Sequence, residues 1–130
     1  MKAYVLDSHV LVWFLCGRPM GKGASRALDT VDAGRATGWI PAVVTIELAL
    51  LHERGRVAIG IAELEATLAR NPLLRILPLD LAQAREFALL RGVRDPFDRM
   101  ILAAAKSTAC PLISADERVA ASGLVDILWD

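Results

Sequence analysis

Short runs of apolar residues alternate along this chain with segments in which apolar residues recur every three or four positions. A short apolar run predicts a buried strand, whereas the longer period predicts an amphipathic helix. The runs predict strands at residues 3–6, 39–42, 74–77, 111–114 and 125–129. Helices are predicted from Ser8 up to Gly17, over residues 23–31, 44–54 and 61–69, from Asp80 to Arg91, from Pro96 through Ala105, and briefly after Asp116.

Capping signals place several of these helix boundaries. Ser8, Thr45 and Asp80 are candidate N-caps, and Asp95-Pro96 combines an acidic cap with proline at the first helical position. Short apolar strands that alternate with helices favour an α/β fold, in which helices cover both faces of a short parallel sheet.

The composition is typical of one globular domain spanning residues 1–130, with 55% hydrophobic and 23% charged residues. This apolar content predicts a large core or an apolar partner-binding face. The formal net charge is zero, so no overall attraction to nucleic acid is expected.

The remaining composition predicts a soluble cytoplasmic protein. Cys16 and Cys110 lack metal-ligand spacing, and we expect them to be buried free thiols in a reducing compartment. Asp7 and His9 interrupt the only stretch that could act as a signal peptide. No run approaches the roughly 18 apolar residues of a membrane-spanning helix.

Four acidic residues interrupt apolar or small-residue runs close to predicted element boundaries. They are Asp7, Glu47, Asp98 and Asp116. An ionised carboxylate in such surroundings is costly unless positive charge lies beside it. Because functional sites form at the carboxyl ends of parallel strands, these acids are expected to converge on one edge. Oxygen ligands suit Mg²⁺, and two such ions could support phosphodiester hydrolysis.

Each of these acids also has a purely structural interpretation. Asp7 and Asp116 could cap helices, and a helix dipole favours acids where Glu47 and Asp98 lie. Glu47 resists this explanation most strongly, because apolar residues flank it on both sides. Asp95 is better explained as an N-cap, although it could also touch a metal.

Several neighbouring residues are candidates for contact with a substrate phosphate. Arg99 and Arg118 directly follow candidate ligands, and they could hold a phosphate, restrain the carboxylates or form ordinary surface pairs. Ser8 and Ser114 are further phosphate candidates. For the aromatic residues Trp13, Phe14 and Trp39, core packing is the default expectation.

The chain resembles the PIN-domain nucleases, and more narrowly the VapC-type toxins, over essentially its whole length. The resemblance is carried by Leu6-Asp7-Ser8-His9-Val10-Leu11-Val12-Trp13, Thr45-Ile46-Glu47-Leu48-Ala49, Asp95-Pro96-Phe97-Asp98-Arg99-Met100-Ile101-Leu102-Ala103-Ala104-Ala105 and Leu112-Ile113-Ser114-Ala115-Asp116. The Asp-Pro-Phe-Asp-Arg segment is its most specific part. Ser8 replaces a usual threonine, and Ile46 replaces a common tryptophan.

The resemblance implies a three-layer sandwich and an endoribonuclease that binds Mg²⁺ or Mn²⁺ through Asp7, Glu47, Asp98 and Asp116. It also implies a homodimer and a small VapB-like antitoxin that silences the enzyme.

Three other classes of protein compete with this interpretation. A phosphoacceptor receiver domain needs a lysine at its site, and Lys2, Lys22 and Lys106 are poorly placed. Nucleases that act on branched DNA carry clamping insertions that this length hardly allows. In a non-catalytic binding module, retention of all four acids would be unexplained.

Overall fold

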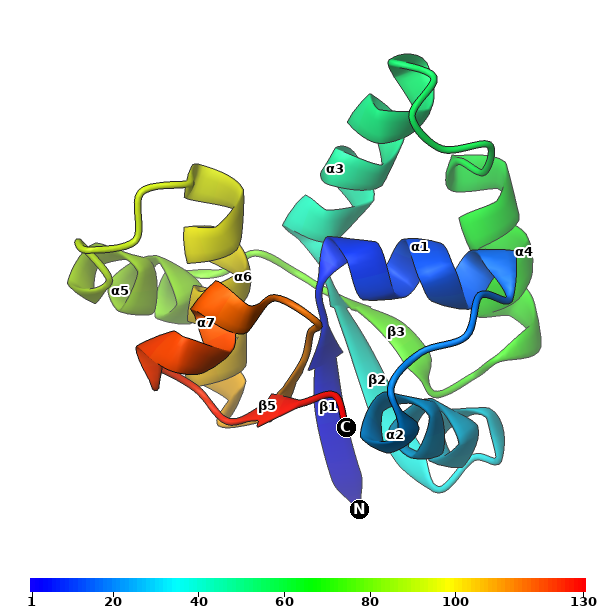
Figure 1. The fold of residues 1–130 in the computed structure, drawn as a ribbon, viewed down its shortest axis with the longest axis horizontal. Helices are drawn as coiled ribbons and strands as arrows, with labels where there is room; N and C mark the ends of the chain where they lie inside the picture. Colours follow the sequence, from blue (N-terminus) through cyan, green and yellow to red (C-terminus); the bar gives the residue numbers. More distant parts are fainter.

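One five-stranded sheet organises the computed structural model, which describes residues 1–130 (Figure 1). All neighbouring strands are parallel, in the order β3-β2-β1-β4-β5. The strands are β1 (Lys2–Leu6), β2 (Ala36–Pro41), β3 (Leu74–Leu77), β4 (Leu112–Ile113) and β5 (Ile127–Leu128). The helices are α1 (Ser8–Cys16), α2 (Lys22–Asp32), α3 (Ala42–Glu53), α4 (Ile61–Arg70), α5 (Leu81–Leu89), α6 (Pro96–Thr108) and α7 (Glu117–Ser122).

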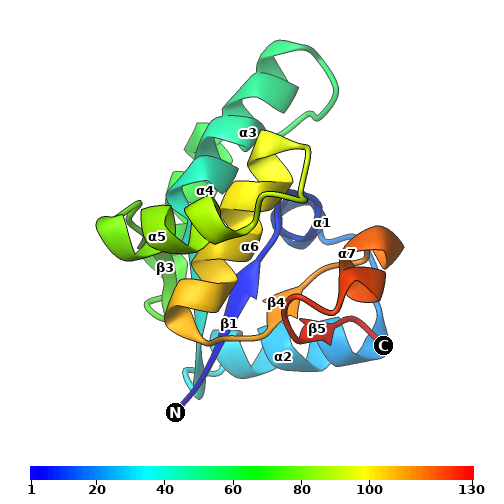
Figure 2. The ribbon, with the colours of Figure 1, turned by 90° about the vertical axis from the view of Figure 1, so that its left-hand side faces the viewer.

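Helices cover both faces of the sheet, as the sequence predicts. In Figure 2, α2 and α6 lie on opposite sides of β1. The central strands β1 and β4 are therefore enclosed, and Val5, Leu6, Leu112 and Ile113 are almost completely buried. Continuous apolar runs are what this double coverage requires, which explains why these strands show no alternation of polar and apolar residues.

The central part of α6 packs closely on the sheet because its side chains are small. Ala103, Ala104 and Ala105 are each at most 1% exposed. Asp95 caps this helix and Pro96 opens it, as predicted from the sequence. This start fixes the position of the first turn of α6, which carries Asp98.

Strand β2 begins at Ala36, three residues before the start that its apolar run predicts. Ala36, Thr37 and Gly38 carry weak strand signals, and their conformation is imposed by pairing with β1. Gly38 also makes room for a neighbour, since a Cβ there would lie 3.1 Å from Leu74 Cδ1. Tertiary packing therefore decided a boundary that local preference did not.

Two of the candidate N-caps, Ser8 and Thr45, were wrong. Asp7, rather than Ser8, caps α1, and α3 begins after Pro41 without a side-chain cap. Thr45 lies inside α3, where its hydroxyl donates back to the Ala42 carbonyl at 2.6 Å. Asp80 does cap α5, as predicted, but that helix ends at Leu89 rather than near Arg91.

Both cysteines are free, but the expectation that both are buried was wrong. Cys16 is exposed at the end of α1, and Cys110 is half-buried. None of the helices combines the length and the apolar character that crossing a membrane would require.

Candidate active site

All the predicted acidic residues line one cleft at the carboxyl edge of the sheet. The cleft has a volume of about 480 Å³. Asp7 follows β1, Asp116 follows β4, Asp95 and Asp98 begin α6, and Glu47 lies in the second turn of α3. Figure 1 shows the first turns of α1 and α3 close to the end of β1, with α6 and α7 beside them. The structure thus brings together residues that are up to 109 positions apart in the sequence.

Three of the aspartates also cap the helices that begin at this cleft. Asp7 Oδ1 accepts a hydrogen bond from the Val10 N–H at 2.9 Å, and Asp95 Oδ2 accepts one from the Asp98 N–H at 3.3 Å. Asp116 Oδ1 accepts from the backbone of Arg118 at 2.9 Å. Helix N-termini favour nearby negative charge, so capping a helix lowers the free-energy cost of keeping each of these carboxylates ionised. Capping therefore coexists with convergence of these acids on the cleft.

Two buried serines hydrogen-bond to acidic residues of the cleft, Ser8 to a carboxylate and Ser114 to a backbone N–H. Ser8, which is 3% exposed, donates a hydrogen bond to Glu47 Oε1. Ser114 is 2% exposed and accepts a hydrogen bond from the Asp116 N–H at 3.1 Å. These contacts favour a positioning role for both serines over the predicted contact with a substrate phosphate.

Burial and repulsion from neighbouring acids raise the pKa of two carboxylates of this cleft, Asp98 and Asp7. Desolvation, followed by repulsion from Asp95 and Asp116, raises the pKa of Asp98 to about 6. Desolvation is also the main cause of the raised pKa of Asp7, which the Ser114 side chain and the Val10 N–H partly offset. Both shifts mean that burial and neighbouring acids outweigh whatever stabilises the charged forms of Asp98 and Asp7.

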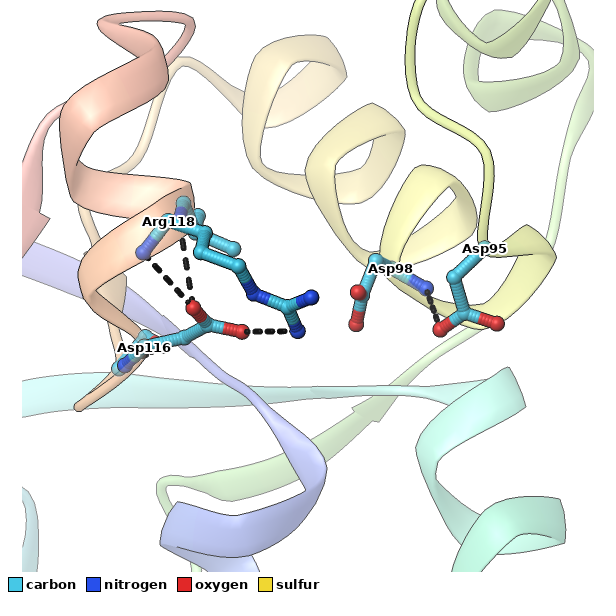
Figure 3. A network of polar contacts seen from close by, with 6 residues as sticks. Asp95, Asp98, Asp116 and Arg118 are labelled. Carbon is cyan, nitrogen blue, oxygen red and sulfur yellow. Dashed lines mark hydrogen bonds and ion pairs between the residues drawn. The ribbon is translucent and has the colours of Figure 1, made fainter.

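Asp116 behaves differently because Arg118 stabilises its charge. Burial alone would raise the pKa of Asp116, but the N–H groups of Arg118 and Val119 and the Arg118 guanidinium lower it. Arg118 Nη2 lies 3.5 Å from Asp116 Oδ2. Figure 3 shows the guanidinium reaching from α7 into the space between Asp116 and Asp98. Arg118 thus contributes positive charge where the acids face each other.

Arg99 makes a structural contact instead of facing the cleft. Its Nε donates to the Phe87 carbonyl at 2.9 Å, and its Cζ lies 4.0 Å from the centre of the Phe87 ring. It is absent from the residues that line the cleft. The prediction that Arg99 holds a substrate phosphate therefore has no support in its position, and we assign it to packing between α5 and α6.

The donor atoms of the cleft suit a hard divalent cation. They are mainly carboxylate oxygens, which Mg²⁺ and Mn²⁺ prefer; His9 also lines the cleft, and no cysteine does. No group of three or more His, Cys, Asp or Glu side chains is arranged to enclose one ion. This arrangement is compatible with an ion that takes one or two carboxylates and completes its shell with water and phosphate.

Two residues that the sequence interpretation left outside the site also line the cleft. His9 and Trp13 lie one helical turn apart on α1, and their ring centroids are 6.0 Å apart. The spacing of His9 and Trp13 relative to Asp7 was the available signal. It was outweighed by the expectation that a tryptophan in an apolar helix belongs to the core.

Comparisons with known proteins agree with this architecture. A family model described as the PIN domain matches residues 4–123, so the chain belongs to the PIN-domain family. A comparison with curated protein sequences gives no match.

Solved structures share the fold at low sequence identity. VapBC2 from Rickettsia felis, bound to a DNA fragment from its promoter, is similar with a TM-score of 0.75, 16% identity and 97% of each chain covered. DNA-bound VapBC from Salmonella typhimurium is similar with a TM-score of 0.70 and 16% identity, and the match covers 98% of this chain and 97% of that one. VapC20 from Mycobacterium tuberculosis, a sarcin–ricin loop cleaving toxin, is similar with a TM-score of 0.63 and 15% identity. That match covers 96% of this chain and 98% of VapC20.

Proposed function

We propose that this protein is an Mg²⁺- or Mn²⁺-dependent endoribonuclease that acts as the toxin of a toxin–antitoxin pair. The observation that carries the proposal is the convergence of Asp7, Glu47, Asp95, Asp98 and Asp116 on one cleft of a PIN-domain chain. The RNA-cleaving activity of the structurally similar VapC20 supports RNA as the substrate.

In the proposed reaction, bound metal would activate water and offset the charge of the phosphate that is attacked. Asp7, Glu47, Asp98 and Asp116 would supply the carboxylates for metal, one or two to each ion, with water and phosphate completing its shell. Ser8 would fix Glu47, and Ser114 would fix the turn before Asp116. Asp95 would mainly position Asp98, since it caps the turn on which Asp98 lies. Arg118, whose side chain is 88% exposed, is free to turn from Asp116 toward a substrate phosphate.

The rival classes of function fit this cleft less well. A receiver domain requires a lysine beside its acids, and none of the residues that line the cleft is a lysine. A binding module without catalysis would gain nothing from burying carboxylates against mutual repulsion, which destabilises the folded chain.

A protein partner is proposed because apolar side chains remain exposed on several helices. Ile46 on α3 is 58% exposed, Ile61 on α4 is 40% exposed, and Leu79, Leu81 and Leu89 around α5 are 60–75% exposed. Apolar residues gathered on a surface mark interfaces. The similar VapBC structures are complexes, which supports a small VapB-like antitoxin together with a homodimer. A basic side chain of the antitoxin among the carboxylates would compete with metal.

Cleavage of a structured RNA pool tests the nuclease proposal. Purified protein is incubated with the pool in Mg²⁺, in Mn²⁺ and in chelator, beside the Asp98→Asn variant. We expect fragments only with metal and only from the unaltered protein. Cleavage that persists in chelator would contradict the metal-dependent mechanism.

Co-expression tests the partner. The chain is produced alone and together with the product of any adjacent short gene, and growth, complex formation and RNA cleavage are compared. We expect growth arrest from the chain alone and relief in the complex. A harmless, monomeric chain that binds no neighbouring product would rule out the toxin role, whereas cleavage of RNA would still support the nuclease.

A further inference from the structure

The cleft is larger than a metal site alone requires. Its volume of about 480 Å³ lies within the range of roughly 300–1,000 Å³ that ligand pockets occupy. An ion with six waters, at about 30 Å³ for each water, accounts for less than half of that space. The remaining space is large enough for another part of a ligand.

Trp13 supplies the main apolar wall of the remaining space. Ile101, Leu102 and Leu112 also line the cleft, but they are 4%, 2% and 1% exposed and present little surface. Ala115 and Val119 line it too and are half-buried, but their side chains are small and not flat. Trp13 is half-buried, so one part of its indole packs on the core while another part remains accessible. A flat apolar surface beside carboxylates suits a ligand with a planar aromatic group close to a phosphate.

Contacts on its other sides hold the indole of Trp13 in place. The Trp129 ring lies 5.5 Å away, centroid to centroid, and Arg18 Cζ lies 5.0 Å from the Trp13 ring centre. Neither Trp129 nor Arg18 lines the cleft. Of the three groups around the indole, only His9 does, and His9 is exposed. The surface turned toward the cleft is thus pre-arranged and bordered by a second aromatic ring.

We propose that Trp13 is a substrate-binding residue on which an unpaired base stacks, next to the phosphate that metal would hold at the carboxylates, with His9 at the edge of the stack. This inference rests on the proposed nuclease function. Every nucleotide joins a phosphate to a planar base, and aromatic side chains bind unpaired bases by stacking without selecting a particular one. Trp13 would therefore strengthen binding of single-stranded RNA and leave the chemical step unchanged.

Two substitutions separate stacking from simple packing. Trp13→Phe keeps an aromatic face, whereas Trp13→Leu keeps apolar bulk and removes the flat ring. Trp39→Phe, on β2 and away from the cleft, is the matched control for losing an indole. We expect Trp13→Leu to raise KM for a single-stranded RNA roughly 5- to 100-fold with little change in kcat, and Trp13→Phe to retain most of the affinity.

A binding measurement checks the same idea without cleavage. In a Trp39→Phe and Trp129→Phe background, Trp13 is the only tryptophan and the candidate metal ligands are kept. The strands carry hydrolysis-resistant linkages, and Mg²⁺ is present. A single-stranded RNA should quench its fluorescence, and an abasic strand of equal length should not. Equal quenching by both strands, or an unchanged KM for Trp13→Leu in an active enzyme, would overturn the inference and leave the nuclease intact.

The remaining outcomes are also decisive. If Trp13→Leu weakens binding of a co-expressed protein partner but not of RNA, Trp13 belongs to a protein interface and the inference fails. If Trp13→Phe and Trp13→Leu lose affinity equally, packing rather than stacking explains the residue. If the unaltered protein neither cleaves nor binds RNA, the nuclease proposal fails, and the inference fails with it.

Discussion

Two requirements conflict at Asp98, because a carboxylate that can bind metal is costly to bury without it. Its pKa of about 6, raised first by desolvation, lies above the value near 4 expected in the unfolded chain. Between these values the folded state binds more protons, so metal-free stability falls as pH rises through this window. Above pH 6, Asp98 is ionised in the folded state, and its full destabilising effect on the metal-free protein is present.

We predict that Asp98→Asn abolishes cleavage while leaving the metal-free protein as stable as the original, or more stable, at pH 7.5. Any gain in stability of Asp98→Asn over the unaltered protein should become smaller near pH 4, where Asp98 is protonated in the folded state. Thermal unfolding in chelator at both pH values measures this. A large loss of stability at pH 7.5 would instead show that Asp98 is needed for the fold.

Asp95 provides the contrasting case three residues earlier. Its side chain caps α6 through the Asp98 N–H, a bond that asparagine can also accept. We predict that Asp95→Asn reduces cleavage less than Asp98→Asn does. It should also lower the pKa of Asp98, because Asp95 is one of the charges that raise it. Activity and its pH profile are measured for both variants, and equal loss would make Asp95 a direct metal ligand.

At the scale of elements, the first turn of α6 is braced against α5 through Arg99. The guanidinium both donates to the Phe87 carbonyl and stacks on the Phe87 ring. We predict that Arg99→Met lowers stability by about 1–3 kcal/mol, since a hydrogen bond and a cation–π contact are lost together.

Arg118→Met is the matched control, because that side chain is exposed and pairs only with Asp116. It should leave stability nearly unchanged and weaken RNA binding instead. Denaturant unfolding and KM distinguish the two variants. Loss of RNA affinity in Arg99→Met without loss of stability would restore Arg99 as a phosphate ligand.

At the scale of the whole molecule, metal binding should depend on folding. The candidate ligands come from separate helices and strands that meet only in the folded cleft. Metal that binds only the folded state stabilises it by mass action. We predict that Mn²⁺ raises Tm of the unaltered protein at pH 7.5 and has little effect on Asp98→Asn. The increase should be smaller at pH 5, where the proton on Asp98 competes. An identical increase in both proteins would place the metal elsewhere.

Much of the fold was predictable because its signals are local. Apolar runs marked the five strands, and Asp80 and Asp95 marked two helix starts as caps. The boundary of β2 was not predictable from local signals. Gly38 is extended because it pairs with β1, and Leu74 leaves little room there for a larger side chain. Asp7 was weighed as a possible cap, but Ser8 was named as the candidate cap of α1, because an acid at the end of a strand also suggested a ligand.

The sequence by itself determined which residues could carry the chemistry. Carboxylates in apolar runs need compensating charge wherever they lie, and the order of strands and helices placed them at one edge of a parallel sheet. Only the tertiary structure decided how each candidate is used. It directs Arg99 to Phe87 and Arg118 to Asp116, and it turns part of Trp13 toward the cleft. The direction in which a side chain points depends on what packs around its helix, and the sequence around that residue does not contain this information.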